Sequence, residues 1–173
     1  MTEAEVSIRL ALYYIKNRLT EQDVEISLDG MHAKCFDIRK FMSENMCTKA
    51  EETDGRWKGR YCVAGFQSNI MIGGKLERGD VRIKLPDGRL IYAECKRGNR
   101  KGESPGVLRP LMQEAIGQLM TGCVMDDRVI PAVAVPYMKK TLEYTEKWRR
   151  LDAIRKMGIH FMLVHESGKV DEY

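Results

Sequence analysis

The stretch GDVRIKLPDGRLIYAECKRG, residues 79–98, constrains the fold of this chain more than any other. Its centre, PDG at 86–88, is typical of a three-residue hairpin loop in which the glycine takes a left-handed conformation. Counting back from this loop along both strands places Asp80 directly opposite Glu94. The loop therefore predicts not only a hairpin but also its register.

Side chains alternate along a strand, so this register assigns every residue of the hairpin to one of two faces. Lys96 shares a face with Glu94, and Asp80 lies on that face as well. The other face is apolar, with Val81, Ile83, Leu85, Ile91, Ala93 and Cys95. We expect the apolar face to be buried, and the opposite face to end in two carboxylates and an ammonium group.

Two opposed carboxylates repel each other unless a cation bridges them. A hard, oxygen-seeking ion such as Mg²⁺ would remove that repulsion, and Lys96 beside it could orient water or stabilise charge on phosphorus. The alternative is a surface ion cluster in which Lys96 pairs with both acids. We favour the catalytic interpretation because the register, the apolar reverse face and the basic loop KRGNRK (96–101) occur together.

Apolar periodicity outside the hairpin predicts alternating helices and strands. Helices are expected at 2–19, 31–46, 110–121 and 139–157, and strands at 23–28, 56–65, 68–74, 128–136 and 159–166. The stretch 128–136 is apolar almost throughout, which is typical of a strand buried on both faces. The sequence thus predicts a single α/β domain over 1–173, built as a sandwich around a mixed sheet.

Composition favours a globular protein of the cytoplasm. Hydrophobic residues make up 43% and charged residues 31% of the chain, and no apolar run approaches the roughly 20 residues that span a bilayer. The acidic start MTEAEV lacks the basic residues of a signal peptide. The cysteines form no CxxC pair, so we expect reduced thiols at Cys35, Cys47, Cys62, Cys95 and Cys123. One HxxC pattern, His32 with Cys35, is by itself a weak indication of metal binding.

The hairpin and the order of elements resemble the PD-(D/E)xK nuclease superfamily, which has the restriction-endonuclease-like fold. GD at 79–80 and ECK at 94–96 match its motif, with 13 residues between the two acids, and the element order fits from 2 to 136. Gly79 stands where the motif has proline, a variation that the superfamily tolerates. The resemblance implies a three-layer sandwich with a mixed central sheet flanked by helices.

The same resemblance implies a function, an Mg²⁺-dependent deoxyribonuclease in which Mn²⁺ can substitute. Asp80 and Glu94 would be the metal ligands, and Lys96 the catalytic lysine. DNA is the expected partner, with RNA not distinguished from it, and no membrane is expected. Cutting both strands of a duplex would call for a second copy, so a homodimer is a further expectation.

Many members of the superfamily also carry an acid on the first helix. Glu5 extends the apolar stripe of Ile8, Leu12, Ile15 and Leu19 by one turn, so it is expected to point toward the sheet. The alternative is a capping box, in which Glu5 only satisfies the backbone at Thr2. Both interpretations stay open, and Glu3 is the second candidate for the acid.

A glutamine on the helix after the lysine strand is another feature of many members. Gln113 and Gln118 are available, and Gln118 is preferred because it shares a face with Leu111 and Ala115. The alternative is that the Gln118 amide has only a structural role, at the edge of the core and hydrogen-bonded to the backbone.

Basic residues near the hairpin are candidates for phosphate contacts. Arg97, Arg100 and Lys101 follow the lysine strand directly, and Arg82 and Lys84 lie on the Asp80 face. A solvated basic loop is the alternative, and the net charge of +4 permits nucleic acid without demanding it. Two rival functions are a catalytically inactive nucleic-acid-binding module of the same fold and a plain interaction domain that binds no divalent metal.

Overall fold

The structure, a computed structural model, describes residues 1–50, 56–73, 76–122 and 126–173. The strands are β1 (Val24–Ser27), β2 (Cys47–Lys49), β3 (Gly59–Val63), β4 (Asn69–Gly73), β5 (Val81–Lys84), β6 (Leu90–Cys95), β7 (Val129–Pro136), β8 (His160–Val164) and β9 (Val170–Glu172). The helices are α1 (Glu3–Lys16), α2 (Gly30–Cys35), α3 (Ile38–Glu44), α4 (Leu108–Gly122), α5 (Lys139–Trp148) and α6 (Asp152–Lys156), with a 3-10 turn η1 (Pro105–Val107).

Within these described ranges, nine strands form one sheet in the order β2-β3-β4-β1-β5-β6-β7-β8-β9. β6, β7 and β8 are mutually parallel, as are β1 and β4, and the other neighbours are antiparallel. The sheet is therefore mixed, and the predicted α/β class is confirmed.

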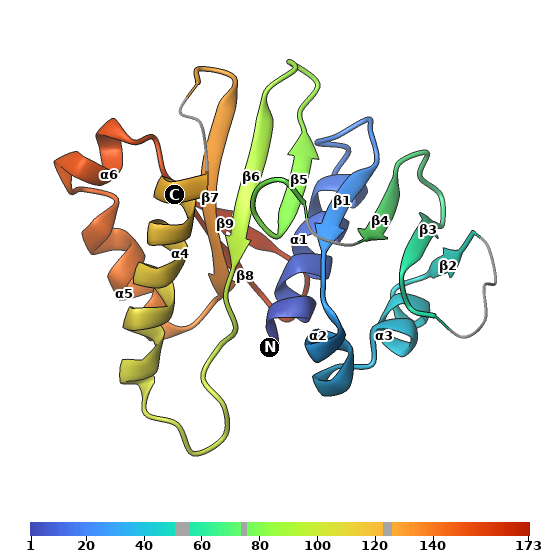
Figure 1. Cartoon of the computed structure of the whole chain (residues 1–173), viewed down its shortest axis with the longest axis horizontal. Helices are drawn as coiled ribbons and strands as arrows, with labels where there is room; N and C mark the ends of the chain where they lie inside the picture. Colours follow the sequence, from blue (N-terminus) through green and yellow to red (C-terminus); the bar gives the residue numbers. More distant parts are fainter. Residues whose placement is uncertain (51–55, 74–75, 123–125) are drawn as a thin grey trace.

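The sheet separates two apolar cores, which gives the molecule three layers. On β7, Ala132 and Ala134 belong to the larger core, whereas Val133 and Val135 belong to a second core with Met112 of α4. This alternation explains why the sequence of β7 is apolar throughout. α1 packs on one face of the sheet, and α4 and α5 cover the other (Figure 1).

The central hairpin has the register that its loop predicts. Val81 faces Ala93 across the β5–β6 ladder, and the amide of Leu85 donates to the carbonyl of Arg89 at 2.8 Å. The predicted apolar face is buried, with Val81, Ile83, Ile91, Ala93 and Cys95 in the larger core and Leu85 packed against it. Turn chemistry and alternation together were sufficient to place this element.

Two predicted helices are each divided in two. The predicted helix at 31–46 is α2 followed by α3, because the Asp37 side chain accepts the Lys40 amide at 3.0 Å and caps a new helix. The predicted helix at 139–157 is α5 followed by α6, with an extended backbone at Leu151 between them. Its predicted end holds, since Gly158 has a φ of +64°.

Smaller differences concern the ends and edges of the fold. α1 ends at Lys16, so Leu19 lies beyond it and is exposed. β2 and β9 were not predicted, because three residues are too few to show alternation. Cys123 and Gly74, the last residue of a predicted strand, lie outside the described residues. The four described cysteines are free thiols, as predicted. No helix in the described ranges combines the length and apolarity needed to cross a membrane.

Candidate active site

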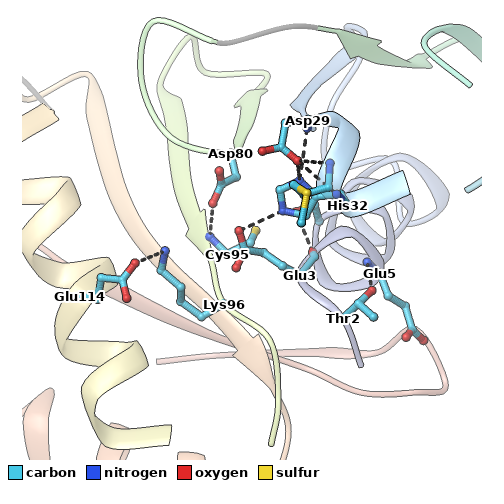
Figure 2. A network of polar contacts seen from close by, with 11 residues as sticks. Thr2, Glu3, Glu5, Asp29, His32, Asp80, Cys95, Lys96 and Glu114 are labelled. Atoms are coloured by element: carbon cyan, nitrogen blue, oxygen red, sulfur yellow. Dashed lines mark hydrogen bonds and ion pairs between the residues drawn. The ribbon is translucent and has the colours of Figure 1, made fainter. Parts of the chain in front are cut away.

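Asp80 lies where the β5–β6 ladder begins, with its side chain held against β6. Its amide donates to the carbonyl of Ala93 at 2.8 Å, and its Oδ2 accepts the amide N–H of Cys95 at 2.8 Å (Figure 2). The neighbouring Glu94 carboxyl is close enough to Asp80 to share a hydrogen bond with it. The structure therefore brings together the two acids that the hairpin register predicted to be opposite.

The backbone before Asp80 requires glycine. Gly79 has a φ of +63°, and a Cβ at this position would lie 3.0 Å from the carbonyl oxygen of Ala93. Proline is restricted to a φ near about −65°, so it could not occupy this position without displacing Asp80. The glycine at this position, where the PD-(D/E)xK motif has proline, thus has a local structural cause.

Three carboxyl groups at this end of the sheet have raised pKa values. Burial and the neighbouring Asp80 raise the pKa of Glu94 to about 7. Burial also raises the pKa of Asp80, although the hydrogen bond from the Cys95 amide opposes that effect. The pKa of Glu3 is raised by burial and by Asp80. The site therefore favours a further cation in addition to Lys96.

Lys96 lies beside these acids and is only 5% exposed. Its Nζ lies 3.1 Å from Oε1 of Glu114 on α4 (Figure 2). Burial opposes the charge of Lys96, but the hydrogen bond to Glu114 and the nearby acids outweigh this and raise its pKa. Lys96 is therefore an ammonium group at neutral pH, and it is not a solvated surface lysine.

The acid that α1 contributes to this cluster is Glu3, and the placement of Glu5 toward the sheet was wrong. The Glu5 carboxylate pairs with Arg9 at 2.9 Å and points away from Asp80 in Figure 2. The apolar stripe through Ile8, Leu12 and Ile15 could not show which face of α1 points toward the sheet, because α1 is buried on most sides. Val6, Leu10 and Tyr14, outside the stripe, are buried as well. Thr2 does cap the helix, accepting the Glu5 amide at 3.2 Å.

Gln118 was also predicted to face the sheet, and this was wrong as well. The residues that α4 buries are Leu108, Met112, Ala115 and Leu119. This stripe leaves both Gln118 and Gln113 exposed. Glu114, one turn before Gln118, contacts the site instead. The helix begins at Leu108, two residues earlier than predicted. Leu108 is the first residue of the buried stripe, so a helix predicted to begin at Pro110 did not include it.

His32 also belongs to the site. The sequence marked it only as part of an HxxC pattern and did not predict that it would lie beside the acids. It lies on α2, beside the start of α1 (Figure 1), and its Nε2 is 3.3 Å from Oε1 of Glu3. The HxxC pattern marked this histidine, but the ring contacts Glu3 and Asp29, and Cys35 is exposed.

The predicted phosphate-binding residues fall into two groups. Arg82 pairs with Glu25 of β1 at 2.8 Å, and Lys84 lies at the loop end of the hairpin, away from Asp80. The other three line a pocket of about 720 Å³ that Glu3 and His32 also line; they are Arg97, Arg100 and Lys101.

Within that second group, one charge is already neutralised. Arg97 makes a two-pronged ion pair with Glu103, at 2.7 and 3.1 Å. Arg100 and Lys101 have exposed side chains, so they are the cations of the loop that are open to a ligand.

In the part of the chain that the structure describes, no three or more His, Cys, Asp and Glu side chains converge to enclose a metal ion. The candidate site instead offers the Asp80–Glu94 pair, and Mg²⁺ commonly takes only one or two carboxylates from a protein. Comparison with protein-family models, curated proteins and solved structures gave no match. The site is interpreted from its geometry and chemistry.

Proposed function

We propose that this chain is an Mg²⁺-dependent deoxyribonuclease with the restriction-endonuclease-like fold. The observation that carries the proposal is the partly buried Asp80–Glu94 pair, both of whose pKa values are raised, beside the ammonium group of Lys96. Two acids that oppose each other's ionisation are stabilised as carboxylates when a divalent cation binds them. The pair therefore has a physical reason to bind one.

The donor set fits Mg²⁺ or Mn²⁺. Asp80 and Glu94 would hold the ion through carboxylate oxygens, which both metals accept, and water and phosphate oxygens would complete its coordination. When bound, the ion would polarise the phosphodiester and lower the pKa of the attacking water.

The residues of the chain have distinct tasks around that phosphate. Lys96 supplies a fixed positive charge at Nζ for the negative charge that grows on the phosphate oxygens during attack. Glu114 keeps Nζ in place and charged through its 3.1 Å contact. Glu3 adds a third carboxylate on the side of the site opposite α4, where it can accept a hydrogen bond from water.

The pocket beside the site gives the substrate a path. Its wall at Arg100 and Lys101 is positively charged, and phosphates that flank the scissile bond are the expected ligands of such a wall. The exposed Glu114 makes the α4 side of the site less favourable for a phosphate chain. We therefore place the nucleic acid over the 97–101 loop.

The decisive test compares Lys96→Ala with the wild type. Plasmid, linear duplex, single-stranded and branched DNA, and a matched RNA, are incubated with Mg²⁺ or Mn²⁺ and with EDTA. We expect metal-dependent cleavage by the wild type and a single-turnover rate at least ~10²-fold lower in Lys96→Ala. Lys140→Ala is the control, because Lys140 also pairs with a helical acid, Glu143, but lies elsewhere. It should cut as fast as the wild type.

Mn²⁺ titration calorimetry separates the rival functions. Lys96→Ala should bind Mn²⁺ as well as the wild type or better, because a competing cation is gone, whereas Glu94→Ala should lose both affinity and rate. Unchanged cleavage in Lys96→Ala would rule out this active site. DNA binding with no cleavage under any condition would indicate a binding module, and no Mn²⁺ binding would indicate an interaction domain.

A further inference from the structure

The short helix α2 presents His32 to the candidate active site through a reciprocal set of local hydrogen bonds. Asp29 caps α2, and its Oδ1 accepts the amides of Met31 at 2.8 Å and His32 at 3.1 Å. In return, the amide of Asp29 donates to Nδ1 of His32 at 3.2 Å. This reciprocal capping box fixes the imidazole ring relative to the helix.

The far side of the fixed ring contacts Glu3. Nε2 of His32 lies 3.3 Å from Oε1 of Glu3, and Figure 2 marks this contact with a dashed line. When Nδ1 accepts the Asp29 amide, the neutral ring carries its hydrogen on Nε2. When the ring is an imidazolium, Nδ1 faces Oδ1 of Asp29 at 2.8 Å, and Nε2 again carries a hydrogen. In these two forms of the ring, His32 donates from Nε2 and Glu3 accepts.

Ordinary core packing does not explain this arrangement. α2 has six residues and none of them is buried, and Met31 is 62% exposed. α2 therefore adds little apolar burial of its own to the fold. What it does add is one directed contact to a half-buried carboxylate that lies near Asp80 and Lys96.

We propose that His32 is a positioning residue of the candidate active site, which holds the Glu3 carboxylate toward Asp80 and Lys96 by donating a hydrogen bond from Nε2 to Oε1. Held by this bond, Glu3 keeps its second oxygen directed into the site, where it can accept a hydrogen bond from water at the metal or on the substrate. Residues that orient groups around a metal site in this way typically change metal affinity or activity by 10–100-fold when they are removed. This inference rests on the proposed function.

The first part of the test compares two substitutions of His32. Single-turnover cleavage is measured against Mn²⁺ concentration, with calorimetric Mn²⁺ binding and thermal unfolding alongside. His32→Ala should lower the rate, or raise the metal concentration required, by about 10–100-fold. His32→Gln keeps an N–H donor near Nε2, so it should recover most of this loss. A contact that only joins α1 to α2 would change the melting temperature without moving the metal dependence.

His165→Ala is the matched control. His165 also contacts a carboxylate through Nε2, that of Asp171 at 2.8 Å, and it stacks on Tyr137 at 4.0 Å between ring centroids. It follows β8, on a different part of the sheet. We expect this substitution to lower the melting temperature and to leave the metal dependence of cleavage unchanged.

A double mutant decides whether His32 acts through Glu3. If it does, Glu3→Gln combined with His32→Ala should be no worse than Glu3→Gln alone. Additive losses, or wild-type rate and metal dependence in His32→Ala, would overturn the inference while leaving the nuclease proposal intact. A wild type that neither binds Mn²⁺ nor cuts would overturn both.

Discussion

At the scale of single residues, the site depends on two carboxyl groups that are held together although they repel. The Cys95 amide holds Asp80 in place with a hydrogen bond to Oδ2, and the β5–β6 register holds Glu94 beside it. Burial raises the pKa of both groups, and the neighbouring Asp80 raises that of Glu94 further, so ionising both acids in the metal-free protein costs stability. The same proximity is what a divalent cation would use.

Asp80→Asn should therefore abolish metal-dependent cleavage without damaging the fold. The asparagine side-chain oxygen can still accept the Cys95 amide, and one of two repelling charges is removed. We expect a melting temperature equal to or slightly above that of the wild type in EDTA, and no further increase on adding Mg²⁺. Asp87→Asn, in the loop of the same hairpin, is the control and should keep full activity. A large loss of stability in Asp80→Asn would instead mark Asp80 as a structural residue.

The pKa of Glu94 predicts an unusual dependence of stability on pH. In the folded, metal-free protein Glu94 keeps its proton up to about pH 7, whereas its ordinary value is 4.5. The unfolded chain binds fewer protons in this window, so the free energy of unfolding should fall as the pH rises from 4.5 to 7. Because Glu94 is partly solvated, we expect a loss on the order of 1 kcal/mol.

Urea unfolding in EDTA at several pH values measures this loss. Glu94→Gln should flatten the decline, whereas a substitution of the exposed Glu21 to Gln should not. Saturating Mg²⁺ selects the ionised pair and should remove or reverse the slope. A wild type whose stability rises steadily over this window would contradict the raised pKa.

Which residues could be predicted depended on what determines their position. Asp80, Glu94 and Lys96 follow from the hairpin loop, because register fixes every side chain of a hairpin. Glu3, His32 and Glu114 depend on how helices are rotated against the sheet. For α1, burial on nearly all sides concealed that rotation, and for α4 an earlier start changed it.

At the scale of elements, side-chain capping determined where helices begin and end, which apolar periodicity did not show. The 31–46 stretch keeps a helical pattern, but Asp37 caps a second helix inside it. One consequence is that α2 ends at Cys35 and stands apart as a short helix carrying His32. The loop at 97–103 shows the same kind of local control, because Glu103 binds both the Arg97 side chain and the Arg100 amide.

This loop structure changes what is expected of its three basic residues. Arg97 is occupied by Glu103, so Arg100 and Lys101 should carry the phosphate contacts. The slope of log affinity against log salt is about 0.9 per phosphate contact on duplex DNA, so Arg100→Ala with Lys101→Ala should reduce it by up to about 1.8. Arg97→Ala should mainly loosen the loop and leave the slope nearly unchanged.

Titrations of a labelled duplex at several salt concentrations, in EDTA to prevent cleavage, give these slopes. Arg149→Ala with Arg150→Ala, on the exposed turn between α5 and α6, is the matched double control. An unchanged slope in the Arg100/Lys101 variant would mean that the loop is solvated and makes no phosphate contacts. A slope reduced equally in both double variants would indicate general electrostatic attraction and not a defined contact.

At the scale of the whole molecule, the candidate site lies at the open end of the hairpin, where α1, α2 and α4 meet around β5 and β6 (Figures 1 and 2). The two strands of a duplex run in opposite directions, so one site attacks one strand at a time. Cutting both strands in a single binding event would take a second copy related by a twofold axis.

Supercoiled plasmid reports which of these applies. If single chains act, dilute protein should produce nicked circles first, and linear DNA should follow only as a second, independent cut. If a homodimer forms on the DNA, linear product should rise more steeply than in proportion to protein concentration. Mixing wild type with Lys96→Ala sharpens the result, because a mixed dimer has one working site and should nick without linearising. Direct linearisation at the lowest concentrations, with no nicked intermediate, would mean that the protein is already a stable dimer before it meets DNA.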